Sequence, residues 1–209
     1  MGESGILKGA DKTKVLIASA TLSVVWIDGL VQRCKDNGFT FLDIPLTGGR
    51  VGAETGSLTL LCGGDEKVIE RLRPILTAIA KKIYYFGPAG CGMRYKLILN
   101  FLQALHIIGF GQAMKIAKDQ GMDLQKVSEA LVDRPGGVIT AIAQKTYFVE
   151  PNPVTFSIEW ISKDLTYAKA LAGALPVSLL NDVLVEYKKA IKQGLSKKDW
   201  ASINTLLTK

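Results

Sequence analysis

The spacing of hydrophobic positions changes character once along the chain, near residue 87. Up to that point, short runs rich in β-branched and aromatic residues alternate with amphipathic stretches of helical spacing. This pattern predicts strands at residues 15–19, 39–46, 57–62 and 83–86, and helices at residues 23–36 and 65–82. Strands separated by helices are typical of a parallel or mixed sheet covered by helices.

From Gly87 onward the apolar positions recur at helical spacing only. Gly87, Gly90 and Gly92 open a run without proline that continues to Lys118, which predicts one helix of about 30 residues. The remaining helices are expected at residues 124–132, 138–146, 158–175 and 177–193, with a break at 134–137 and a last turn capped by Ser196 or Asp199. The chain therefore divides into an α/β part and an all-α part, with the long helix at the seam.

Composition limits what such a chain does. Its 209 residues can bury one large core or two small ones. The net charge of +7 raises nucleic acid as a partner, but the basic residues are dispersed and no aromatic residues interleave with them, so we expect no nucleic-acid binding. Three widely spaced cysteines and one histidine argue against a disulfide framework and a zinc site, so no metal is expected.

The longest apolar run, residues 97–114, is interrupted by Asn100, Gln103, His106 and Gln112. A spanning helix needs roughly 18 to 20 predominantly apolar residues, so we expect a core helix rather than a membrane span. The first residues lack the basic and apolar regions of a signal peptide, which favours the cytoplasm.

Lys96 and Asn100 are the first candidate site residues. They lie four positions apart, so on a helix their side chains project from one face, one turn apart. Lys96 can instead be a surface lysine whose stem covers apolar surface, and Asn100 can fix a neighbouring helix. The glycines just before Lys96 favour a site, whereas the two readings of Asn100 are nearly balanced. His106 is expected to be a core residue rather than a catalyst.

Four segments carry a family resemblance. Asp43 begins Asp-Ile-Pro-Leu-Thr-Gly-Gly; Gly87 begins Gly-x-x-Gly-x-Gly-x-x-x-Lys-x-x-x-Asn; Lys163 begins Lys-Asp-Leu; and Ser196 begins Ser-Lys-Lys-Asp. In this order the segments resemble the β-hydroxyacid dehydrogenases, the family of 3-hydroxyisobutyrate dehydrogenase and 6-phosphogluconate dehydrogenase. The similarity extends over nearly the whole chain, and the run from Gly87 is its most specific part.

The resemblance implies a fold and an activity. The fold is an α/β partial Rossmann-like domain at residues 1–87, the second half of a dinucleotide-binding domain, followed by an all-α domain at 88–209 with a long interdomain helix. The activity is hydride transfer between NAD or NADP and a small 3-hydroxy acid or semialdehyde such as 3-hydroxyisobutyrate. The residues implied are Lys96 and Asn100 for catalysis, Thr47, Gly48 and Gly49 for the substrate, and Thr21 and Lys163 for the cofactor.

Departures from the family pattern bear on the cofactor. The family's Gly-x-Gly-x-x-Gly sequence, which places the pyrophosphate at a helix N-terminus, does not occur in the 209 residues. The resemblance therefore implies a truncated form that starts midway through the cofactor domain and binds cofactor poorly by itself. Around Thr21, the residues Ala18, Ala20 and Val24 replace the usual Asp, Ser and Pro, and Leu99 stands where many members have Asn.

Alternative readings stay open for the other candidates and for the protein. Thr47 can be ordinary turn chemistry before two glycines, and Lys163 a solvated helix residue. The chain can be a 3-hydroxyacid oxidoreductase, or a non-catalytic remnant that dimerises through its helical half. A relative that acts on imines is disfavoured by Lys96. Either main reading predicts a homodimer, built from the long helix and the helices after residue 158.

Overall fold

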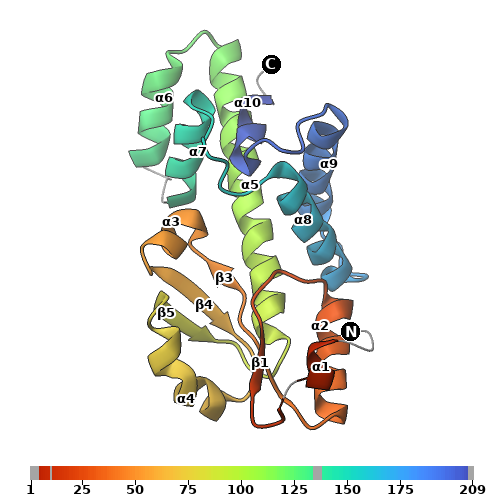
Figure 1. The fold of residues 1–209 in the computed structure, drawn as a ribbon. Coiled ribbons are helices and arrows are strands. Elements are labelled where there is room, and N and C mark those ends of the chain that lie inside the picture. The colour runs from red at the N-terminus through yellow and green to blue at the C-terminus, as the bar shows by residue number, and fades with distance from the viewer. Residues whose placement is uncertain (1–4, 10, 134–137, 207–209) are drawn as a thin grey trace. The chain divides into compact units, whose positions relative to one another are not determined.

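The computed structural model describes residues 5–9, 11–133 and 138–206. The chain forms two compact units, Met1–Ile98 and Leu99–Lys209, and the division falls inside the longest helix. Each unit is described by itself below, with the element labels of Figure 1.

Unit 1 is an α/β unit whose strands form two small sheets (Figure 1). β1 and β2 pair in parallel, while β4 pairs in parallel with β5 and antiparallel with β3. The single bridge between Asp43 and Gly63 joins the end of β2 to the end of β4. The elements in chain order are α1 (Ile6–Gly9), β1 (Val15–Ala18), α2 (Val24–Asp36), β2 (Thr40–Asp43), β3 (Leu46–Thr47), α3 (Gly49–Glu54), β4 (Leu58–Cys62), α4 (Glu66–Leu76), β5 (Ala80–Tyr85) and the start of α5 (Cys91–Asp119).

Local sequence signals explain the helix boundaries of unit 1. The Ser23 hydroxyl accepts a hydrogen bond from the Trp26 amide and so caps α2. The helix ends at Asp36, and Asn37 and the left-handed Gly38 follow it. The Asp65 carboxylate caps α4 by accepting from the amides of Lys67 and Val68. The predicted partial Rossmann-like arrangement of strands and helices is confirmed.

Two predicted elements of unit 1 were wrong in extent. The strand expected at 39–46 is split into β2 and β3, because Pro45 lacks the amide that would continue a ladder. The helix expected at 65–82 ends at Leu76, where the Thr77 hydroxyl donates to the carbonyl of Arg73. Residues 80–85 join β4 as β5 instead, so the parallel pairing prevailed over local helical spacing. The short helices α1 and α3 were not predicted.

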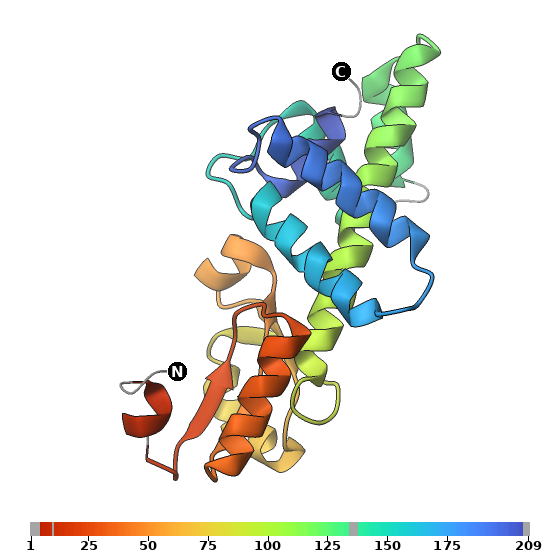
Figure 2. The same cartoon turned by 90° about the vertical axis from the view of Figure 1, so that its right-hand side faces the viewer.

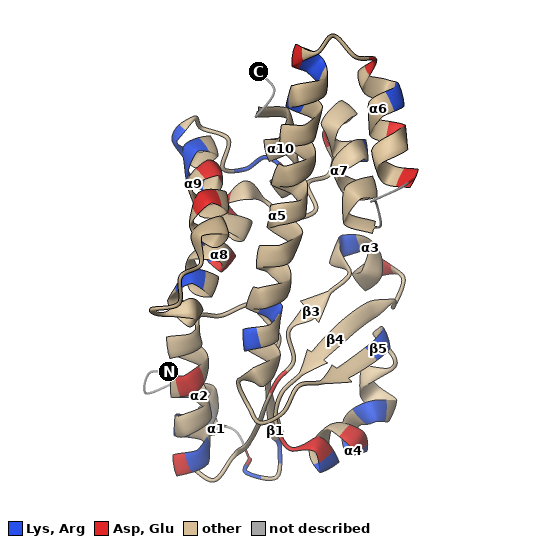
Figure 3. Cartoon of the chain, turned by 180° about the vertical axis from the view of Figure 1, so that it is seen from behind, with Lys and Arg blue, Asp and Glu red and all other residues tan. Residues whose placement is uncertain are grey.

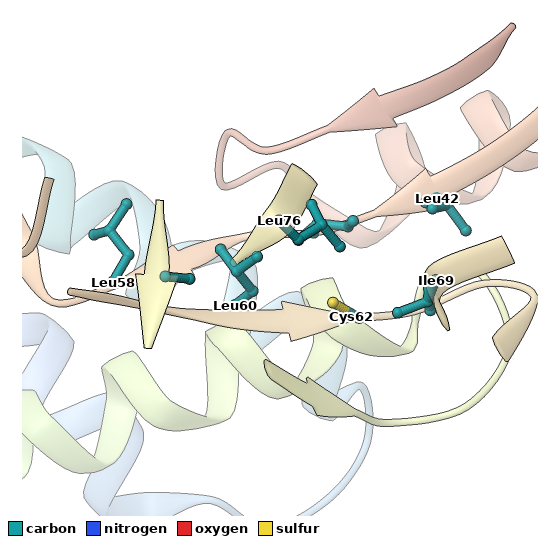
Figure 4. Close-up of a cluster of buried hydrophobic side chains, with 8 residues drawn as sticks. Leu42, Leu58, Leu60, Cys62, Ile69 and Leu76 are labelled. Atoms are coloured by element: carbon teal, nitrogen blue, oxygen red, sulfur yellow. The ribbon is translucent and has the colours of Figure 1, made fainter. Parts of the chain in front are cut away.

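The core of unit 1 lies between the sheet and α4 (Figure 4). β4 supplies three of its side chains and α4 supplies two, and all of them are nearly inaccessible to solvent. Burying an aliphatic side chain of this size contributes about 1.5–3 kcal/mol, so this cluster accounts for much of the stability of the unit. Its members are Leu42, Ile44, Leu58, Leu60, Cys62, Ile69, Leu76 and Ala80.

Unit 2 is all-helical, as predicted. It comprises the rest of α5, then α6 (Leu124–Leu131), α7 (Val138–Phe148), α8 (Ile158–Ala172), α9 (Ser178–Lys192), the 3-10 turn η2 (Trp200–Ser202) and α10 (Ile203–Leu206). The Asp199 carboxylate accepts from the Ala201 amide and caps η2, so of the two caps considered it is Asp199 that acts. The break expected at 134–137 lies outside the described residues.

The 29 residues of α5 form the longest helix described. It is long and apolar enough to cross a membrane by length and composition, a test that core helices of soluble proteins also pass. Several of its side chains pack inside the chain, including Leu97, Ile107 and Met114, each with no exposed surface. His106, expected in the core, is exposed. The expectation of no membrane span stays a prediction.

Charged residues are dispersed over the surface helices. Basic and acidic side chains both occur on α4, α6 and α9 (Figure 3). In contrast, α5 carries no Asp, Glu, Lys or Arg from Leu97 to Met114. The absence of nucleic-acid binding stays a prediction.

Candidate functional site

The start of α5 is fastened to the sheet by a buried carboxylate. Asp43 is the last residue of β2 and is fully buried. One of its carboxylate oxygens accepts from the Gly90 amide and the other from the Met93 amide, both at 2.6 Å. Amides at a helix N-terminus have no partners within the helix, so the carboxylate fixes where α5 begins. Lys96 follows one turn later on the same helix, so the contacts of Asp43 also determine where the Lys96 backbone lies.

Two glycines beside Asp43 allow close packing of the backbone. A Cβ on Gly92 would lie 2.2 Å from the Leu61 carbonyl oxygen, and a Cβ on Gly63 would lie 2.3 Å from the Asp43 carboxylate. No other residue fits at either position without displacing the sheet or the helix. Gly92 therefore allows α5 to pack closely against β4. From the sequence, the glycines before Lys96 indicated a site.

Arg94 joins the start of α5 to α2. Its guanidinium donates to both carboxylate oxygens of Asp28, at 2.9 and 2.8 Å, and to the Gly90 carbonyl at 3.2 Å. Nearby, the Leu22 amide donates to the Met93 sulfur at 3.2 Å. The turn after β1, which contains the predicted cofactor residue Thr21, is thus tied to the same segment. Thr21 itself is half-buried.

Lys96 and Asn100 are both on α5, four positions apart. Lys96 is half-buried, whereas Asn100 is 2% exposed. In unit 2, the Asn100 amide nitrogen donates to an Asp164 carboxylate oxygen at 2.7 Å, which joins α5 to α8. Asn100 therefore fixes a neighbouring helix, which is the structural role that the sequence left open for it. Roles for Asn100 and Lys96 in catalysis stay predictions.

Asp164 is the centre of a small polar group on α8. It is 1% exposed, and the Lys163 ammonium lies 3.2 Å from its second carboxylate oxygen. The Lys163 ammonium also lies 5.6 Å from the centre of the Tyr167 ring. Lys163, predicted to bind the cofactor, is thus held against α8 with 42% of its side chain exposed. An amide, a carboxylate and an ammonium meet here, which is a set able to hold a proton or a polar substrate group.

The Thr47-Gly48-Gly49 segment runs from the end of β3 into α3. Gly48 has φ of 121° and Gly49 has φ of 61°, so the turn uses backbone conformations that other residues rarely adopt. A Cβ on Gly49 would meet nothing within 4 Å, which means that its backbone is open to approach. Thr47 is half-buried. The roles of all three in substrate binding stay predictions.

Burial changes the acidity of two groups near the start of α5. It raises the pKa of the Asp43 carboxyl above its ordinary value, although the amides of Gly90 and Met93 act in the opposite direction. Burial also raises the pKa of the Cys62 thiol to about 11, with a smaller contribution from the Asp43 charge. Cys62 therefore stays a neutral core residue at physiological pH and is unsuited to act as a nucleophile.

Two strand-to-helix turns of unit 1, those before α2 and α4, do not fit the pyrophosphate of a dinucleotide. Such a cradle needs glycine and available amides at a helix N-terminus. The turn from β1 to α2 has no glycine, and the Ser23 hydroxyl already accepts from the Trp26 amide. In the turn from β4 to α4, a Cβ on Gly64 would lie 2.3 Å from Leu42, and the Asp65 carboxylate occupies the helix start. A dinucleotide would find no phosphate site at either of these two turns.

Sequence reasoning assigned Asp43 to the substrate segment and missed its contact with α5. It likewise missed the ion pair of Asp28 with Arg94 and the contact of Asn100 with Asp164. The available signal was a charged residue among apolar positions. Asp43 follows Phe41 and Leu42 on β2. Asp164 shares one face of α8 with Ile161 and Ala168. The partner of such a residue cannot be read from a sequence when it lies 47 to 66 positions away.

Comparisons with protein families give the same division of the chain. Residues 1–87 match the NAD-binding domain of 6-phosphogluconate dehydrogenase, and residues 90–207 match the NAD-binding family of NADP-dependent 3-hydroxyisobutyrate dehydrogenase. The second match covers more than half of the chain.

Similar proteins are longer than this chain. Mitochondrial 3-hydroxyisobutyrate dehydrogenase of Drosophila melanogaster is 30% identical over 96% of this chain and 65% of its own length. The 2-hydroxy-3-oxopropionate reductase of Escherichia coli is 30% identical over 86% of this chain and 62% of its own length. Among solved structures, 3-hydroxyisobutyrate dehydrogenase of Mycobacterium tuberculosis with L-serine has a TM-score of 0.85 at 25% identity, covering 98% of this chain and 73% of that one. The chain thus spans about two thirds of the length of these relatives.

Proposed function

The chain belongs to the 3-hydroxyisobutyrate dehydrogenase family, and on that premise we propose that it carries the substrate-side half of an NAD(P)-dependent oxidoreductase. The substrate is a small 3-hydroxy acid or the corresponding semialdehyde. One observation carries the proposal. Lys96 and Asn100 lie one turn apart on α5, directly after a start that Asp43, Gly63 and Gly92 fix against the sheet.

Lys96 is the proposed proton carrier. Oxidation of a hydroxyl group requires that its proton leave together with the hydride, and a positioned amine can accept that proton. In the reverse direction, the ammonium form donates a hydrogen bond to the carbonyl oxygen as negative charge develops there. NAD(P), when bound, supplies the hydride acceptor or donor. The anchored start of α5 supports this role, because it limits where the Lys96 side chain can reach.

Asn100 and its partners are proposed to hold the substrate near Lys96. The Asn100 side chain is fixed by its hydrogen bond to Asp164, so its amide dipole has one orientation. The Asp164 carboxylate and the Lys163 ammonium neutralise each other at 3.2 Å. The open backbone at Gly49, next to the Thr47 hydroxyl, is the proposed contact for the substrate carboxylate.

A hybrid enzyme tests the proposed activity. The part of the Drosophila 3-hydroxyisobutyrate dehydrogenase outside the match would be fused ahead of these 209 residues, which take the place of the matched part. We expect NAD(P)H formation with 3-hydroxyisobutyrate or L-serine. A folded hybrid that binds NAD(P) but oxidises no small hydroxy acid would favour the alternative, a non-catalytic module of the same fold.

We further expect that the 209-residue chain alone binds NAD(P) weakly, with a Kd above roughly 1 mM, because it has no Gly-x-Gly-x-x-Gly sequence and its turns before α2 and α4 lack a phosphate cradle. Isothermal titration calorimetry with NAD and with NADP measures this. Micromolar affinity would contradict the expectation and would show that the missing glycine sequence is not needed.

A homodimer through the helical part remains a proposal. The exposed apolar surface available for it is smaller than the sequence suggested. Several large apolar residues of these helices are at most 5% exposed and pack within the chain, namely Ile108, Phe110, Val183 and Tyr187. Exposed apolar side chains remain on α5, α8 and α9, and light scattering on the purified chain measures whether they associate. They are Leu102, Ile116, Trp160, Leu179 and Val185.

A further inference from the structure

Two large apolar side chains border the polar group centred on Asp164. In unit 2, α8 lies against α5, and Asn100 donates to Asp164 between the two helices (Figure 2). On α5, the half-buried Leu99 directly precedes Asn100. On α8, Trp160 comes four positions before Asp164 and is 51% exposed. Both side chains are thus next to groups that are proposed to hold the substrate.

Trp160 shares one face of α8 with Lys163 and Tyr167. The three residues are three and four positions apart, so their side chains lie one above the other along the helix. The Lys163 ammonium is 5.6 Å from the centre of the Tyr167 ring, and the centre of the Trp160 ring is 6.0 Å from that of Phe156. Lys163 therefore has an aromatic side chain on the turn before it and another on the turn after it. Tryptophan is enriched at binding surfaces, where its ring contributes a large apolar contact.

Leu99 brings an apolar side chain to the neighbourhood of Lys96. It lies three positions after Lys96 on α5, so the two side chains are neighbours on the helix surface, with Cβ atoms roughly 5–6 Å apart. In the proposed function, Lys96 takes the proton from the hydroxyl at C3 of the substrate. The next carbon, C2, then lies within reach of Leu99. An isobutyl group offers a substituent at C2 only apolar contact.

Neither α5 nor α8, both described over their full length, offers an unpaired carboxylate for a substrate cation. Asp164 contacts the Asn100 amide and the Lys163 ammonium. Glu159, the other acidic residue of α8, lies 2.6 Å from the Lys197 ammonium. The first acidic residue on α5 is Asp119, roughly 30 Å along the helix from Leu99. An ammonium beside Leu99 would therefore lose hydration without gaining a carboxylate, which disfavours its binding.

We propose that Leu99 and Trp160 determine the substrate specificity of this site by contacting the group at C2 of a 3-hydroxy acid. They favour an apolar group over a hydroxyl, and a hydroxyl over an ammonium. This specificity rests on the proposed function, because that function places a 3-hydroxy acid at Lys96. Two compounds named with the relatives differ at C2: 3-hydroxyisobutyrate carries a methyl group there, and L-serine carries an ammonium.

A matched series of three acids tests the order. 3-Hydroxyisobutyrate, glycerate and L-serine share a carboxylate and a hydroxymethyl group, and carry a methyl, a hydroxyl and an ammonium at C2. Each would be titrated into the full 209-residue chain at neutral pH, with NMR following the Leu99 methyl groups and the Trp160 indole N–H. We expect 3-hydroxyisobutyrate to shift both signals and to bind at least about tenfold more tightly than L-serine, with glycerate between them.

Substitutions at Leu99 test its contribution. Leu99→Asn presents a donor and an acceptor to the C2 group, and should bring the affinities for 3-hydroxyisobutyrate and L-serine to within about threefold of each other. Leu99→Met keeps an apolar side chain of similar volume and should keep the parental order. Ile116→Asn makes the same kind of change at a 65% exposed position of α5, roughly 25 Å along the helix, and should have no effect.

Substitutions at Trp160 decide the question if Leu99→Asn does not fold. Half of the Trp160 side chain is exposed, so its replacement costs little stability. Trp160→Gln should lower the preference for 3-hydroxyisobutyrate over L-serine at least about threefold. Trp160→Phe keeps an aromatic ring and should retain the preference.

Three results would overturn the inference. One is that neither signal of the parent chain responds to any of the three acids. Another is binding of L-serine that is equal to or tighter than that of 3-hydroxyisobutyrate. The third is a Trp160 signal that follows the protein concentration and not the acid, which would place Trp160 in a contact between two copies of the chain.

The hybrid enzyme separates this inference from the proposed function. Oxidation of L-serine in preference to 3-hydroxyisobutyrate would support the function and contradict the specificity. The expected order of binding, without turnover of any of the three acids in a hybrid that binds NAD(P), would support the specificity and contradict the function.

Discussion

Asp43 and Asp164 are both buried carboxylates, one in each unit, and they are satisfied by different kinds of partner. Asp43 is 0% exposed and accepts from two backbone amides. Asp164 is 1% exposed and contacts two side chains, the Asn100 amide and the Lys163 ammonium. A carboxylate bonded to backbone amides fixes the path of the chain, whereas one bonded to side chains fixes groups that can take part in chemistry.

The comparison of Asp43 with Asp164 separates polar residues that fix the backbone from polar residues that can take part in chemistry. Asp43 belongs to the segment that resembles a substrate site, but its contacts show it holding the start of α5. Asn100 and Lys163 come from separate helices, and both contact Asp164. We therefore assign Asp43 to the positioning of Lys96, and Asp164 to the positioning of Asn100.

The largest expected effect is that of Asp43→Ala. It leaves the buried amides of Gly90 and Met93 without acceptors, and we expect a loss of about 3–5 kcal/mol in the free energy of unfolding. Chemical denaturation measures it. Asp28→Ala is the control, since it breaks an ion pair that is half exposed and should cost less than about 1 kcal/mol. Equal losses in the two variants would contradict the anchoring role of Asp43.

The next effect is a dependence of stability on alkaline pH. Burial raises the pKa of Cys62 from 9.0 to about 11, so between these values the unfolded chain loses a proton that the folded chain keeps. Stability therefore falls as the pH rises from 9 to 11, by up to about 2–3 kcal/mol in all.

Denaturation of the parent and of Cys62→Ala at several pH values isolates this contribution, because other groups titrate in both proteins. The curve of the parent should be steeper between pH 9 and 11. Asp43→Asn should reduce the difference slightly, since the Asp43 charge adds to the rise in the thiol pKa. Parallel curves for the parent and Cys62→Ala would contradict the buried, neutral thiol.

A smaller effect is expected for the coupling of Asn100 with Asp164. A double-mutant cycle with Asn100→Leu and Asp164→Leu should give a coupling free energy of about 1–2 kcal/mol, because each single change leaves a buried polar group unpaired. A pair of Asn100→Leu with Asp123→Leu serves as the control, since Asp123 caps a different helix and should add independently. A coupling indistinguishable from that control would mean that the hydrogen bond does not position Asn100.

The sequence predicted the order of elements well, because capping residues and hydrophobic spacing act locally. Ser23, Asp65, Asp123 and Asp199 each cap a helix near the expected position. It predicted α4 too long, because the pairing of β5 with β4 depends on contacts distant in sequence. The spacing of Lys96 and Asn100 and the family resemblance supplied the candidate site residues. The partners of Asp43, Arg94 and Asn100 could not be predicted, because they too are distant in sequence.

The most direct test of the account is the effect of Lys96 on turnover in the hybrid enzyme. A proton carrier contributes roughly 10²–10⁴-fold to rate, so Lys96→Met should lower kcat by at least about 100-fold while KM changes by less than about threefold. Thermal unfolding and NAD(P) binding of the variant should match the parent. The account would be contradicted if the Lys96→Met hybrid folds, binds cofactor and retains the parental kcat. Lys96 would then not be the proton carrier, and the start of α5 that Asp43 anchors would have no role in catalysis.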